Sequence, residues 1–465
     1  MTLRRPARIL VVGSGAREHA IAWKLAGEPG VEAVTVAPGS AGIAAAGRSG
    51  IEPGLDPLDG PGVVAVARAQ HADLVVVGPE APLAAGVADV LREAGFATFG
   101  PGAAAARIET SKAWCHEVAA AAGVRMARAA AFEEPGPAVA YARELAATGL
   151  GVVVKADGLA AGKGVTVCDA VEEALPAIAT IFSRPTDGPD VPRVVVEERL
   201  FGLEASLIAL CDGRDALALP PARDHKRLLD GDRGPNTGGM GAYSPLPDLP
   251  DGAVEAIVDT THRPLLAELA RRGTPFRGAL YAGLILTADG PVLLECNARF
   301  GDPETQVLLP RLAVDLGPLL LAAAEGGLAA VAAELGICGS LVPAGDEAAV
   351  GIVLAAAGYP EAPRRGDPIA GLVFAEEAGA LVFHAGTALL PDGRFATAGG
   401  RILTVVGRGA DLAEARAQAE AAADRVAFTG LQRRGDIAAV LPRTATDPGP
   451  GRVIQSSGAV AGAGR

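Results

Sequence analysis

Lysine and asparagine are scarce in this chain of 465 residues. The 41 basic residues include only five lysines, at positions 24, 112, 155, 163 and 226, and the only asparagines are 236 and 297. Lysine carries a compact point charge that arginine does not reproduce at a phosphate. Because four of these lysines and both asparagines fall in glycine-rich or polar segments, those segments are the first candidates for a functional site.

The chain also lacks paired cysteines and long apolar runs. Its five cysteines, at 115, 168, 211, 296 and 338, have no paired spacing, which predicts a reducing compartment and disfavours a zinc site. We find neither a secretion signal nor a run long enough to span a bilayer. The net charge of -13 argues against a broad nucleic-acid surface but allows a local basic pocket. We therefore expect a cytoplasmic monomer that acts on small molecules, with no nucleic-acid or membrane partner.

The stretch 293–306, L-L-E-C-N-A-R-F-G-D-P-E-T-Q, is the most polar candidate site. If its first half is a strand, Glu295, Asn297 and Arg299 share one face. Magnesium takes oxygen ligands of the first two kinds, and Arg299 then faces an anion beside the metal. Asp302 is a candidate cap for a helix that follows. The alternative is a solvated edge strand.

The N-terminus predicts a doubly wound α/β domain. An apolar strand at 8–12 leads into a glycine turn at 13–18, a helix, and a second strand at 31–36. The turn has Glu18 where a dinucleotide fingerprint has its third glycine, and no acid follows the second strand, so dinucleotide binding is disfavoured. The turn still suits an anion at a helix N-terminus, and Arg17 in the first helical turn would then face a phosphate.

The next segments extend the same pattern. A buried strand at 73–77 ends near Glu80, which is placed either for a sugar hydroxyl or simply as an acid at a helix N-terminus. A further strand at 96–99 closes the domain, which we assign to residues 1–107. Lys112, in the first turn of the following helix, is unfavourable against the helix dipole and so predicts a bound anion.

A second lobe, about 125–198, is built around the glycine-rich segment 151–167. It reads as strand, glycine loop, strand, and it is not a Walker A motif, because neither the spacing nor a following helix is present. A hairpin with free backbone N–H groups, Lys155 and Lys163 can cover phosphates; an ordinary glycine hairpin is the alternative. The strand 194–200 that follows can offer its backbone to an adenine, with Glu204 near ribose or metal, or it is a solvated edge.

The segment 224–245 is polar and rich in glycine, and we expect a long loop there. Long loops inside compact domains are usually functional or disordered, and the presence of Lys226 and Asn236 favours a substrate loop. Residues 108–342 then form one large domain. A smaller C-terminal domain spans 343–443, and the Gly/Ala/Pro/Ser-rich segment 444–465 predicts a disordered tail.

Six motifs together closely resemble the phosphoribosylamine–glycine ligases, an ATP-grasp family of purine biosynthesis. They are G-S-G-A-R-E-H-A at 13–20, V-G-P-E-A-P-L at 77–83, K-A-D-G-L-A-A-G-K-G-V at 155–165, D-H-K-R at 224–227, G-P-N-T-G-G-M-G-A-Y-S-P at 234–245 and R-F-G-D-P-E-T-Q at 299–306. The resemblance spans residues 8 to about 440. It implies an α/β and α+β fold: an N-terminal doubly wound parallel sheet, a two-lobed ATP-grasp and a small mixed α/β C-terminal domain.

The resemblance also implies a reaction and a set of site residues. Glycine would be joined to phosphoribosylamine through a glycyl phosphate, with ATP as co-substrate giving ADP and phosphate, and with Mg²⁺ or Mn²⁺ as cofactor. The implied metal ligands are Glu295 and Asn297; the implied ATP-binding residues are Lys112, Lys155, Gly162, Lys163, Gly164, Glu197, Leu200 and Glu204; the implied substrate-binding residues are Gly13, Ser14, Gly15, Arg17, Gly39, Glu80, Asn236 and Asp302; and Asp224, Lys226 and Arg299 are implied as catalytic.

The chain departs from the family pattern at a few positions. Ala16 and Thr110 stand where glycine is common, and Arg223 stands where glutamine is common, which adds a charge beside the substrate segment. Many ATP-grasp enzymes carry a carboxylate ligand for a second metal on the strand before the one with the E-x-N ligands. The strand 280–287 of this chain offers none, so the resemblance does not assign ligands for a second metal. Another ATP-grasp carboxylate–amine ligase or a non-catalytic nucleotide-binding protein would be the alternatives, although a binding module would not need both a metal pair and Arg299.

Overall fold

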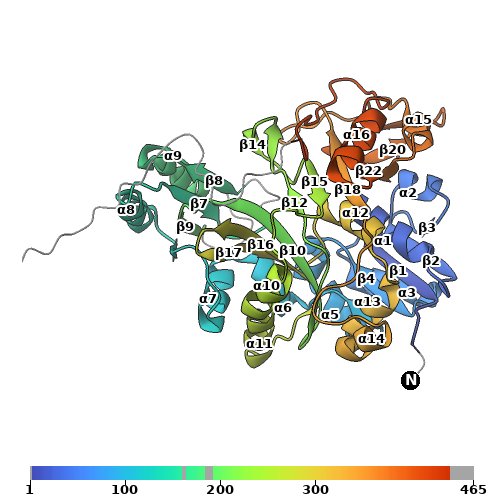
Figure 1. Cartoon of the computed structure of the whole chain (residues 1–465), viewed down its shortest axis with the longest axis horizontal. Coiled ribbons are helices and arrows are strands. Elements are labelled where there is room, and N and C mark those ends of the chain that lie inside the picture. The colour runs from blue at the N-terminus through green and yellow to red at the C-terminus, as the bar shows by residue number, and fades with distance from the viewer. Residues whose placement is uncertain (1–2, 160–163, 184–191, 440–465) are drawn as a thin grey trace, which may run out of the picture.

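The computed structural model of the chain describes residues 3–159, 164–183 and 192–439. Figure 1 shows the N-terminal sheet at one side of the molecule and the lobe of α8 and α9 at the opposite side, with long antiparallel strands between them. The C-terminal elements lie above the N-terminal sheet in this view. No helix within the described residues is both long and apolar enough to cross a membrane. The expected tail at 444–465, with Gly162 and Lys163, lies outside the described residues.

The N-terminal sheet is fully parallel, with the strand order β3-β2-β1-β4-β5. Because alternate residues of a strand face opposite sides, Ile9 and Val11 join one core and Leu10 and Val12 join another. The predicted doubly wound start is therefore confirmed. The strands are β1 (Arg8–Gly13), β2 (Ala33–Pro38), β3 (Gly50–Ile51), β4 (Leu74–Val77) and β5 (Thr98–Phe99); the helices are α1 (Ala16–Ala26), α2 (Ala41–Ala45), α3 (Gly60–Ala69), α4 (Glu80–Ala84), α5 (Val87–Glu93), α6 (Ala103–Thr110) and α7 (Lys112–Ala122).

The glycine-rich segment forms the predicted hairpin, within an antiparallel sheet of order β6-β9-β7-β8. Val152, Val154 and Ala156 pack toward the helices of the lobe. The alternation therefore leaves Val153 and Lys155 on the opposite face, which lines a large cavity. The strands are β6 (Ala129–Phe132), β7 (Val152–Ala156), β8 (Val165–Cys168) and β9 (Val194–Glu198); the helices are α8 (Pro135–Ala146) and α9 (Val171–Phe182).

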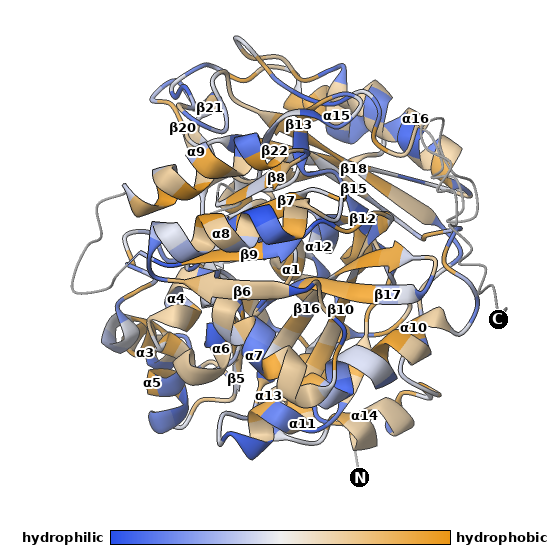
Figure 2. Ribbon diagram, turned by 90° about the vertical axis from the view of Figure 1, so that its left-hand side faces the viewer, coloured by the Kyte–Doolittle hydropathy of each residue, from blue (hydrophilic) through white to orange (hydrophobic). Residues whose placement is uncertain are grey.

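The central sheet has the order β11-β10-β16-β17 and helices on both faces. Ile208 and Leu210 pack with α13, whereas Leu207 and Ala209 pack with α11. In Figure 2 the strands β10 and β16 carry mostly the hydrophobic colours, while α7 and α11 combine hydrophilic and hydrophobic turns. Its strands are β10 (Leu203–Asp212), β11 (Ala216–Ala218), β16 (Arg277–Thr287) and β17 (Gly290–Asn297); the helices are α10 (Ala253–Ile257), a π-turn (Val258–His262), α11 (Arg263–Arg271), α12 (Glu304–Leu308), a 3-10 turn (Leu309–Arg311), α13 (Leu316–Glu325) and α14 (Leu328–Glu334).

The expectation of a long loop at 224–245 is wrong, because this segment contains four short strands. β12 (Arg223–Asp224) and β15 (Gly241–Ser244) belong to a sheet of order β12-β15-β18-β22-β19, whose other strands lie after residue 347. β13 (Arg227–Leu229) and β14 (Arg233–Asn236) form a hairpin between them. The remaining elements are β18 (Ala348–Ala355), α15 (Leu372–Glu377), β19 (Leu381–His384), β20 (Thr387–Leu389), β21 (Phe395–Thr397), β22 (Arg401–Gly409) and α16 (Leu412–Ala423).

A pair of buried histidines joins α1 to β19. The backbone N–H of His384 donates to Nδ1 of His19 at 2.9 Å, and Nδ1 of His384 lies 3.0 Å from the Thr387 hydroxyl. Burial lowers the pKa of His19 to about 3, helped by the charge of His384, and burial lowers the pKa of His384 to about 4. Both rings are therefore neutral at neutral pH.

Candidate active site

A cavity of about 1190 Å³ lies between the N-terminal sheet, the hairpin lobe, the central sheet and the C-terminal sheet. It brings together side chains that are as much as 419 positions apart in the chain, from Arg17 to Asp436. Most of the residues singled out from the sequence line it: Arg17, Glu80, Lys112, Lys155, Gly164, Glu197, Leu200, Glu204, Asp224, Lys226, Asn236, Glu295, Asn297, Arg299 and Asp302.

Within the N-terminal glycine turn, Arg17 lines this cavity, but Gly13, Ser14 and Gly15 do not. The carboxylate of Glu18 reaches back and accepts the Gly15 N–H at 2.8 Å, so the chain's own acid occupies this helix N-terminus. Gly13 and Gly39 are joined by a backbone hydrogen bond of 3.0 Å. A Cβ on Gly13 would lie 2.6 Å from Cγ of Glu18, which explains why the turn needs glycine there. The substrate roles of Gly13, Ser14, Gly15 and Gly39 stay predictions.

Lys226 lies among three carboxylates. Its Nζ is 3.4 Å from Oε1 of Glu295 and 3.6 Å from Oε2 of Glu204. Burial disfavours the ammonium, but Glu295, Asp224 and Glu204 outweigh this effect and raise the pKa of Lys226 well above its ordinary value. Lys226 is therefore a fixed cation in this cavity.

The two acids beside Lys226 differ in their protonation. The charge of Lys226, followed by the charges of Lys155 and Lys112, lowers the pKa of Glu295 to about 2. Burial raises the pKa of Asp224 to about 8, although Lys226 opposes this shift. Two carboxyl groups near one lysine with separated pKa values are a pattern common at reactive centres.

Arg299 is held by acids from two other elements. Its Nε donates to Glu80 at 3.2 Å, and one Nη is 3.1 Å from Oε1 of Glu109. The other Nη donates to the backbone oxygen of Phe300 at 3.2 Å. The contacts of the carboxylates outweigh burial and raise the pKa of Arg299 above its ordinary value. Glu80 thus meets a guanidinium in this structure, and its expected sugar contact stays a prediction.

Lys155 and Lys112 both line the cavity, Lys155 from β7 and Lys112 from the first position of α7. Nζ of Lys155 is 2.8 Å from Oε2 of Glu197, whose other oxygen is 2.8 Å from Nε2 of His116. Nζ of Lys112 donates to the backbone oxygen of Gly158 at 2.8 Å. Glu197 therefore holds the ammonium group of Lys155 in place, a role that the sequence did not indicate.

Asp302 does not cap α12; the N-cap is Pro303, and the Asp302 carboxylate is used elsewhere. Its Oδ2 accepts from Nη2 of Arg401 at 2.7 Å, and its Oδ1 accepts from Gln306 at 2.7 Å. Arg401 also donates to the Gly238 oxygen at 2.6 Å. A residue of β22 thus ties the 301–303 turn to the segment after β14.

Arg223 does not present a free charge to the cavity. Its guanidinium forms a two-point ion pair with Asp248, at 3.1 and 2.8 Å, and donates to the Tyr243 hydroxyl at 2.8 Å. The side chains of both ion partners are almost fully buried. Its positive charge is compensated within the protein, so Arg223 adds no unpaired charge beside the 224–245 segment.

Glu295 and Asn297 are suited to hold a metal only together with a bound anion. Both line the cavity from β17. In the part of the chain that the structure describes, no cluster of three or more His, Cys, Asp or Glu could hold a metal ion alone. Three lysines also surround Glu295, and their charge disfavours a bare cation. Oxygens from a triphosphate and from water would complete the ligand set and offset this charge.

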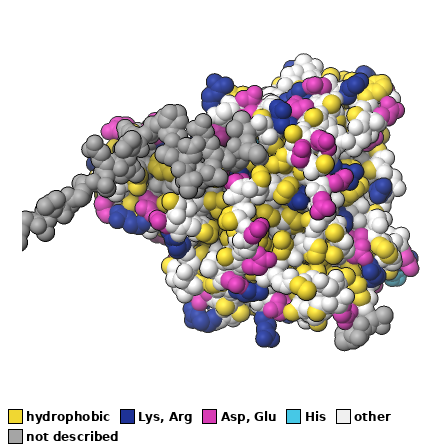
Figure 3. All heavy atoms as spheres, in the orientation of Figure 1, with side chains coloured by type: hydrophobic (Ala, Val, Ile, Leu, Met, Phe, Trp, Pro, Cys, Tyr) yellow, Lys and Arg dark blue, Asp and Glu magenta, His cyan; other side chains and the backbone are white. Residues whose placement is uncertain are grey.

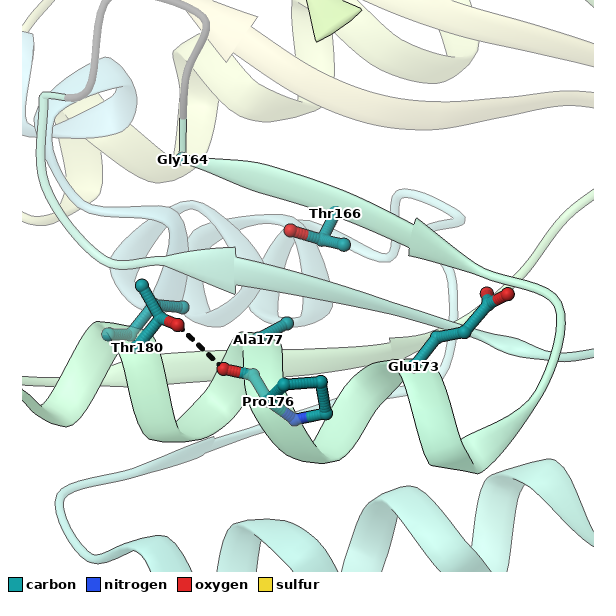
Figure 4. Close-up of a pocket in the computed structure, with 7 residues that line it drawn as sticks. Gly164, Thr166, Glu173, Pro176, Ala177 and Thr180 are labelled. Atoms are coloured by element: carbon teal, nitrogen blue, oxygen red, sulfur yellow. Dashed lines mark hydrogen bonds between the residues drawn. The ribbon is translucent and has the colours of Figure 1, made fainter. Parts of the chain in front are cut away.

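A second, smaller hollow of about 280 Å³ lies between β8 and α9. Figure 4 shows Thr166 on the strand and Glu173, Pro176, Ala177 and Thr180 along the helix. The Thr180 hydroxyl donates to the Pro176 backbone oxygen at 2.7 Å. Of the described residues that line it, Glu173 alone is charged, and none is a lysine or arginine of the large cavity.

Sequence models of three phosphoribosylglycinamide synthetase domains match almost the whole described chain. The N domain matches residues 7–109, the ATP-grasp (A) domain residues 110–305 and the C domain residues 349–440. The chain belongs to the phosphoribosylglycinamide synthetase family. The recognition of this family from the six motifs, and with it the predicted fold class, is confirmed.

Individual relatives agree with this family. The chain is 50% identical over 437 residues to a phosphoribosylamine–glycine ligase of Streptomyces coelicolor, covering 93% of this chain and 99% of that protein. A crystal structure of the Thermotoga maritima phosphoribosylamine–glycine ligase superposes with a TM-score of 0.75 at 33% identity, covering 92% of this chain and 100% of that one. A Campylobacter jejuni biotin carboxylase shares the fold, with a TM-score of 0.64 at 15% identity, over 93% of this chain and 94% of that one.

Among the cavity residues that the sequence did not single out, three make ion pairs or hydrogen bonds with predicted site residues: Glu109, His116 and Arg401. Glu109 could have been noticed, because an acid in the last turn of a helix is unfavourable against the dipole. His116 lies four residues after Lys112 and thus on the same face of α7. Arg401 follows two glycines but has no sequence signal for its contact with Asp302, which depends on the tertiary fold.

Proposed function

We propose that this protein joins glycine to phosphoribosylamine, consuming ATP and releasing ADP and phosphate, in purine biosynthesis. The single observation that carries the proposal is the meeting of three groups in one cavity of a chain of this family. Arg17 and Glu80 come from the N domain, Lys112 from α7 and Lys155 from β7, and the polar face of residues 295–299 from the central sheet.

Two lysines suit the phosphates of ATP. Lys112 and Lys155 are cations at one cavity, and each is fixed by a neighbour, the Gly158 oxygen for one and the Glu197 carboxylate for the other. Fixed cations lower the cost of bringing the phosphates together with a carboxylate substrate. Leu200 and Glu204 follow β9 at the rim, where we propose that adenosine binds.

Arg299 suits the phosphoryl group in transfer. Three of its five N–H groups are engaged by Glu80, Glu109 and Phe300, so two remain for substrate oxygens as far as the described residues show. Positioning and charge neutralisation are the main requirements of phosphoryl transfer. A divalent metal held by Glu295 and Asn297 would supply further neutralisation of phosphate charge. The nearby Lys226 and Asp224 would orient the glycine carboxylate and the attacking amine.

No covalent nucleophile is required for this reaction. A glycine carboxylate is a poor electrophile, and phosphorylation turns it into an acyl phosphate that the sugar amine can attack. The nitrogen–carbon bond forms as the carbon–oxygen bond to phosphate breaks. Cys296, which lies between Glu295 and Asn297 in the sequence, is buried, and its hydrogen bond with Cys115, followed by burial, raises its pKa well above the ordinary value, which suits a packing role.

The test is a substrate panel in which ADP release is measured with purified protein. Glycine, phosphoribosylamine, ATP and Mg²⁺ should together give ADP and a new amide, whereas alanine, serine or aspartate in place of glycine should give at least tenfold less. Omission of the sugar amine should reduce ADP release to a slow background. Equal turnover with another amino acid would favour a different ATP-grasp ligase, and nucleotide binding without turnover would favour a binding protein.

The choice between Mg²⁺ and Mn²⁺, the monomeric state and the cytoplasmic location also remain proposals. The free cysteines among the described residues support the cytoplasmic location. Figure 3 shows charged and hydrophobic side chains intermixed on the face that it displays, outside the grey atoms. Size-exclusion chromatography with light scattering tests the monomeric state: a mass near twice that of the chain would contradict a monomer.

A further inference from the structure

Glu109 is a buried carboxylate at the end of α6 with both oxygens engaged. Its Oε1 lies 3.1 Å from a guanidinium nitrogen of Arg299, and its Oε2 accepts the backbone N–H of Ala298 at 2.8 Å. Only 6% of its side chain is exposed. It therefore touches both the side chain of Arg299 and the backbone between Asn297 and Arg299.

Stability alone does not account well for an acid at this place. The last turn of a helix disfavours a negative charge, and burial raises the pKa of Glu109, although Arg299 opposes that shift. A buried ion pair is often no better for stability than packed apolar groups. The ion pair between Glu109 and Arg299 instead fixes the orientation of the guanidinium group.

The contacts of Arg299 show what Glu109 adds. Glu80, the first residue of α4, holds Nε, and the backbone oxygen of Phe300, the residue next to Arg299, holds one Nη. Glu109 is the partner that joins Arg299 to the helix immediately before Lys112. The position of Arg299 is thereby tied to the start of α7, where Lys112 lines the same cavity.

We infer that Glu109 is a positioning residue for the ligase reaction, one that aligns Arg299 and the Asn297–Arg299 backbone with the transferred phosphoryl group. The inference rests on the proposed function, since it assigns Arg299 to phosphoryl transfer. Glu109 itself makes no substrate contact in this assignment. Its loss should therefore lower the rate of chemistry and leave ATP affinity nearly unchanged.

A double-mutant cycle with Glu109→Gln and Arg299→Lys tests the inference. Glutamine keeps an acceptor for the Ala298 N–H and removes the charge that faces Arg299. We expect kcat to fall at least about tenfold, because small displacements of a positioning group are costly, with KM for ATP within twofold of the unchanged protein. In the Arg299→Lys background the same substitution should lower kcat less than threefold.

The matched control is Glu28→Gln, because Glu28 is another buried carboxylate that accepts backbone N–H groups, from Leu316 at 2.6 Å and Gly317 at 2.8 Å, but it does not line the cavity. It should lower thermal stability without changing kcat at 25 °C. A Glu109→Gln enzyme with unchanged kcat, or additive effects in the cycle, would overturn the inference.

The experiment distinguishes a variant that does not fold, a failure of the proposed function and a failure of the inference alone. If Glu109→Gln does not fold, the cycle is run with Glu109→Asp, which keeps the charge but shortens its reach, and a fall in kcat without a change in KM for ATP is again required. If the unchanged protein releases no ADP with its three substrates, the proposed function fails and the inference falls with it. If the unchanged protein turns over but the cycle is additive, only the inference fails.

Discussion

Replacing Glu295 by glutamine should have opposite effects on ATP binding with and without metal. Oε1 of Glu295 lies 3.4 Å from Nζ of Lys226, and the charges of Lys226, Lys155 and Lys112 lower the pKa of Glu295 from 4.5 to about 2. In the proposed function, the phosphates of ATP would bind in this same positive potential. Without metal, the Glu295 carboxylate and the phosphates compete for it.

The pKa gives the size of this competition. A displacement from 4.5 to about 2 corresponds to roughly 3 kcal/mol. Because about a third of the Glu295 side chain is exposed, solvent screening reduces the value to about 2 kcal/mol. Glutamine removes the competitor, so metal-free ATP should bind up to about 30-fold more tightly. With metal, loss of a carboxylate ligand should lower turnover at least about 100-fold, since a bound metal contributes several kcal/mol to charge stabilisation.

Calorimetry measures the first effect, with ATP titrated in the presence of EDTA, and ADP release at saturating Mg²⁺ measures the second. Melting curves of both proteins, with Glu28→Gln as the comparison, show whether the fold is retained. Normal turnover of Glu295→Gln at saturating Mg²⁺ would refute the metal role. Weaker metal-free ATP binding than in the unchanged protein would refute the electrostatic reasoning.

Three other outcomes are expected. Arg223→Gln should destabilise the protein by about 3 kcal/mol, because it leaves Asp248 buried without its partner, and Arg223→Gln with Asp248→Asn should recover most of this loss in urea unfolding. Glycine with heavy oxygen in its carboxylate should transfer one labelled oxygen to phosphate per turnover; AMP and pyrophosphate as products would contradict an acyl phosphate. Since folding lowers the pKa of His384 from 6.5 to about 4, the stability from its neutral ring is complete above pH 6.5 and is lost as the pH falls toward 4. The loss amounts to about 2 kcal/mol by pH 5, so His384→Asn should make the stability curve shallower between pH 7 and 5, and His19, whose pKa burial also lowers, should keep part of the slope.

Sequence patterns predicted the elements whose signals are local. The apolar run at 8–12 and the glycine turn after it gave β1 and α1, and the rare Lys226 and Asn297 led to the cavity. The prediction of a loop at 224–245 was wrong because the strands there depend on pairing with distant residues. β15 becomes a strand through pairing with β18, more than 100 residues later, and G-A-Y-S has no alternation of its own.

The supporting residues of the site were harder to find than the residues that face it. Glu109 and Arg401 act through contacts with Arg299 and Asp302, and neither contact follows from spacing along the chain. Glu18 is another residue whose role could not be predicted from the sequence. The glycine turn predicted a bound anion, and the anion that occupies it is a side chain three positions beyond Gly15.

The sheet of β12, β15, β18, β22 and β19 constrains how such proteins can be recombined. β15 is hydrogen-bonded on one side to β12 and on the other to β18, so one sheet combines strands from 223–244 and 348–409. A chimera that exchanges only the residues after about 345 brings together two half-sheets of different origin, and a fragment that ends there exposes the backbone edge of β15 to aggregation. The exchangeable unit in this family is therefore discontinuous in sequence, and two fragments cut near 345 should be recovered in native form only when they are produced together.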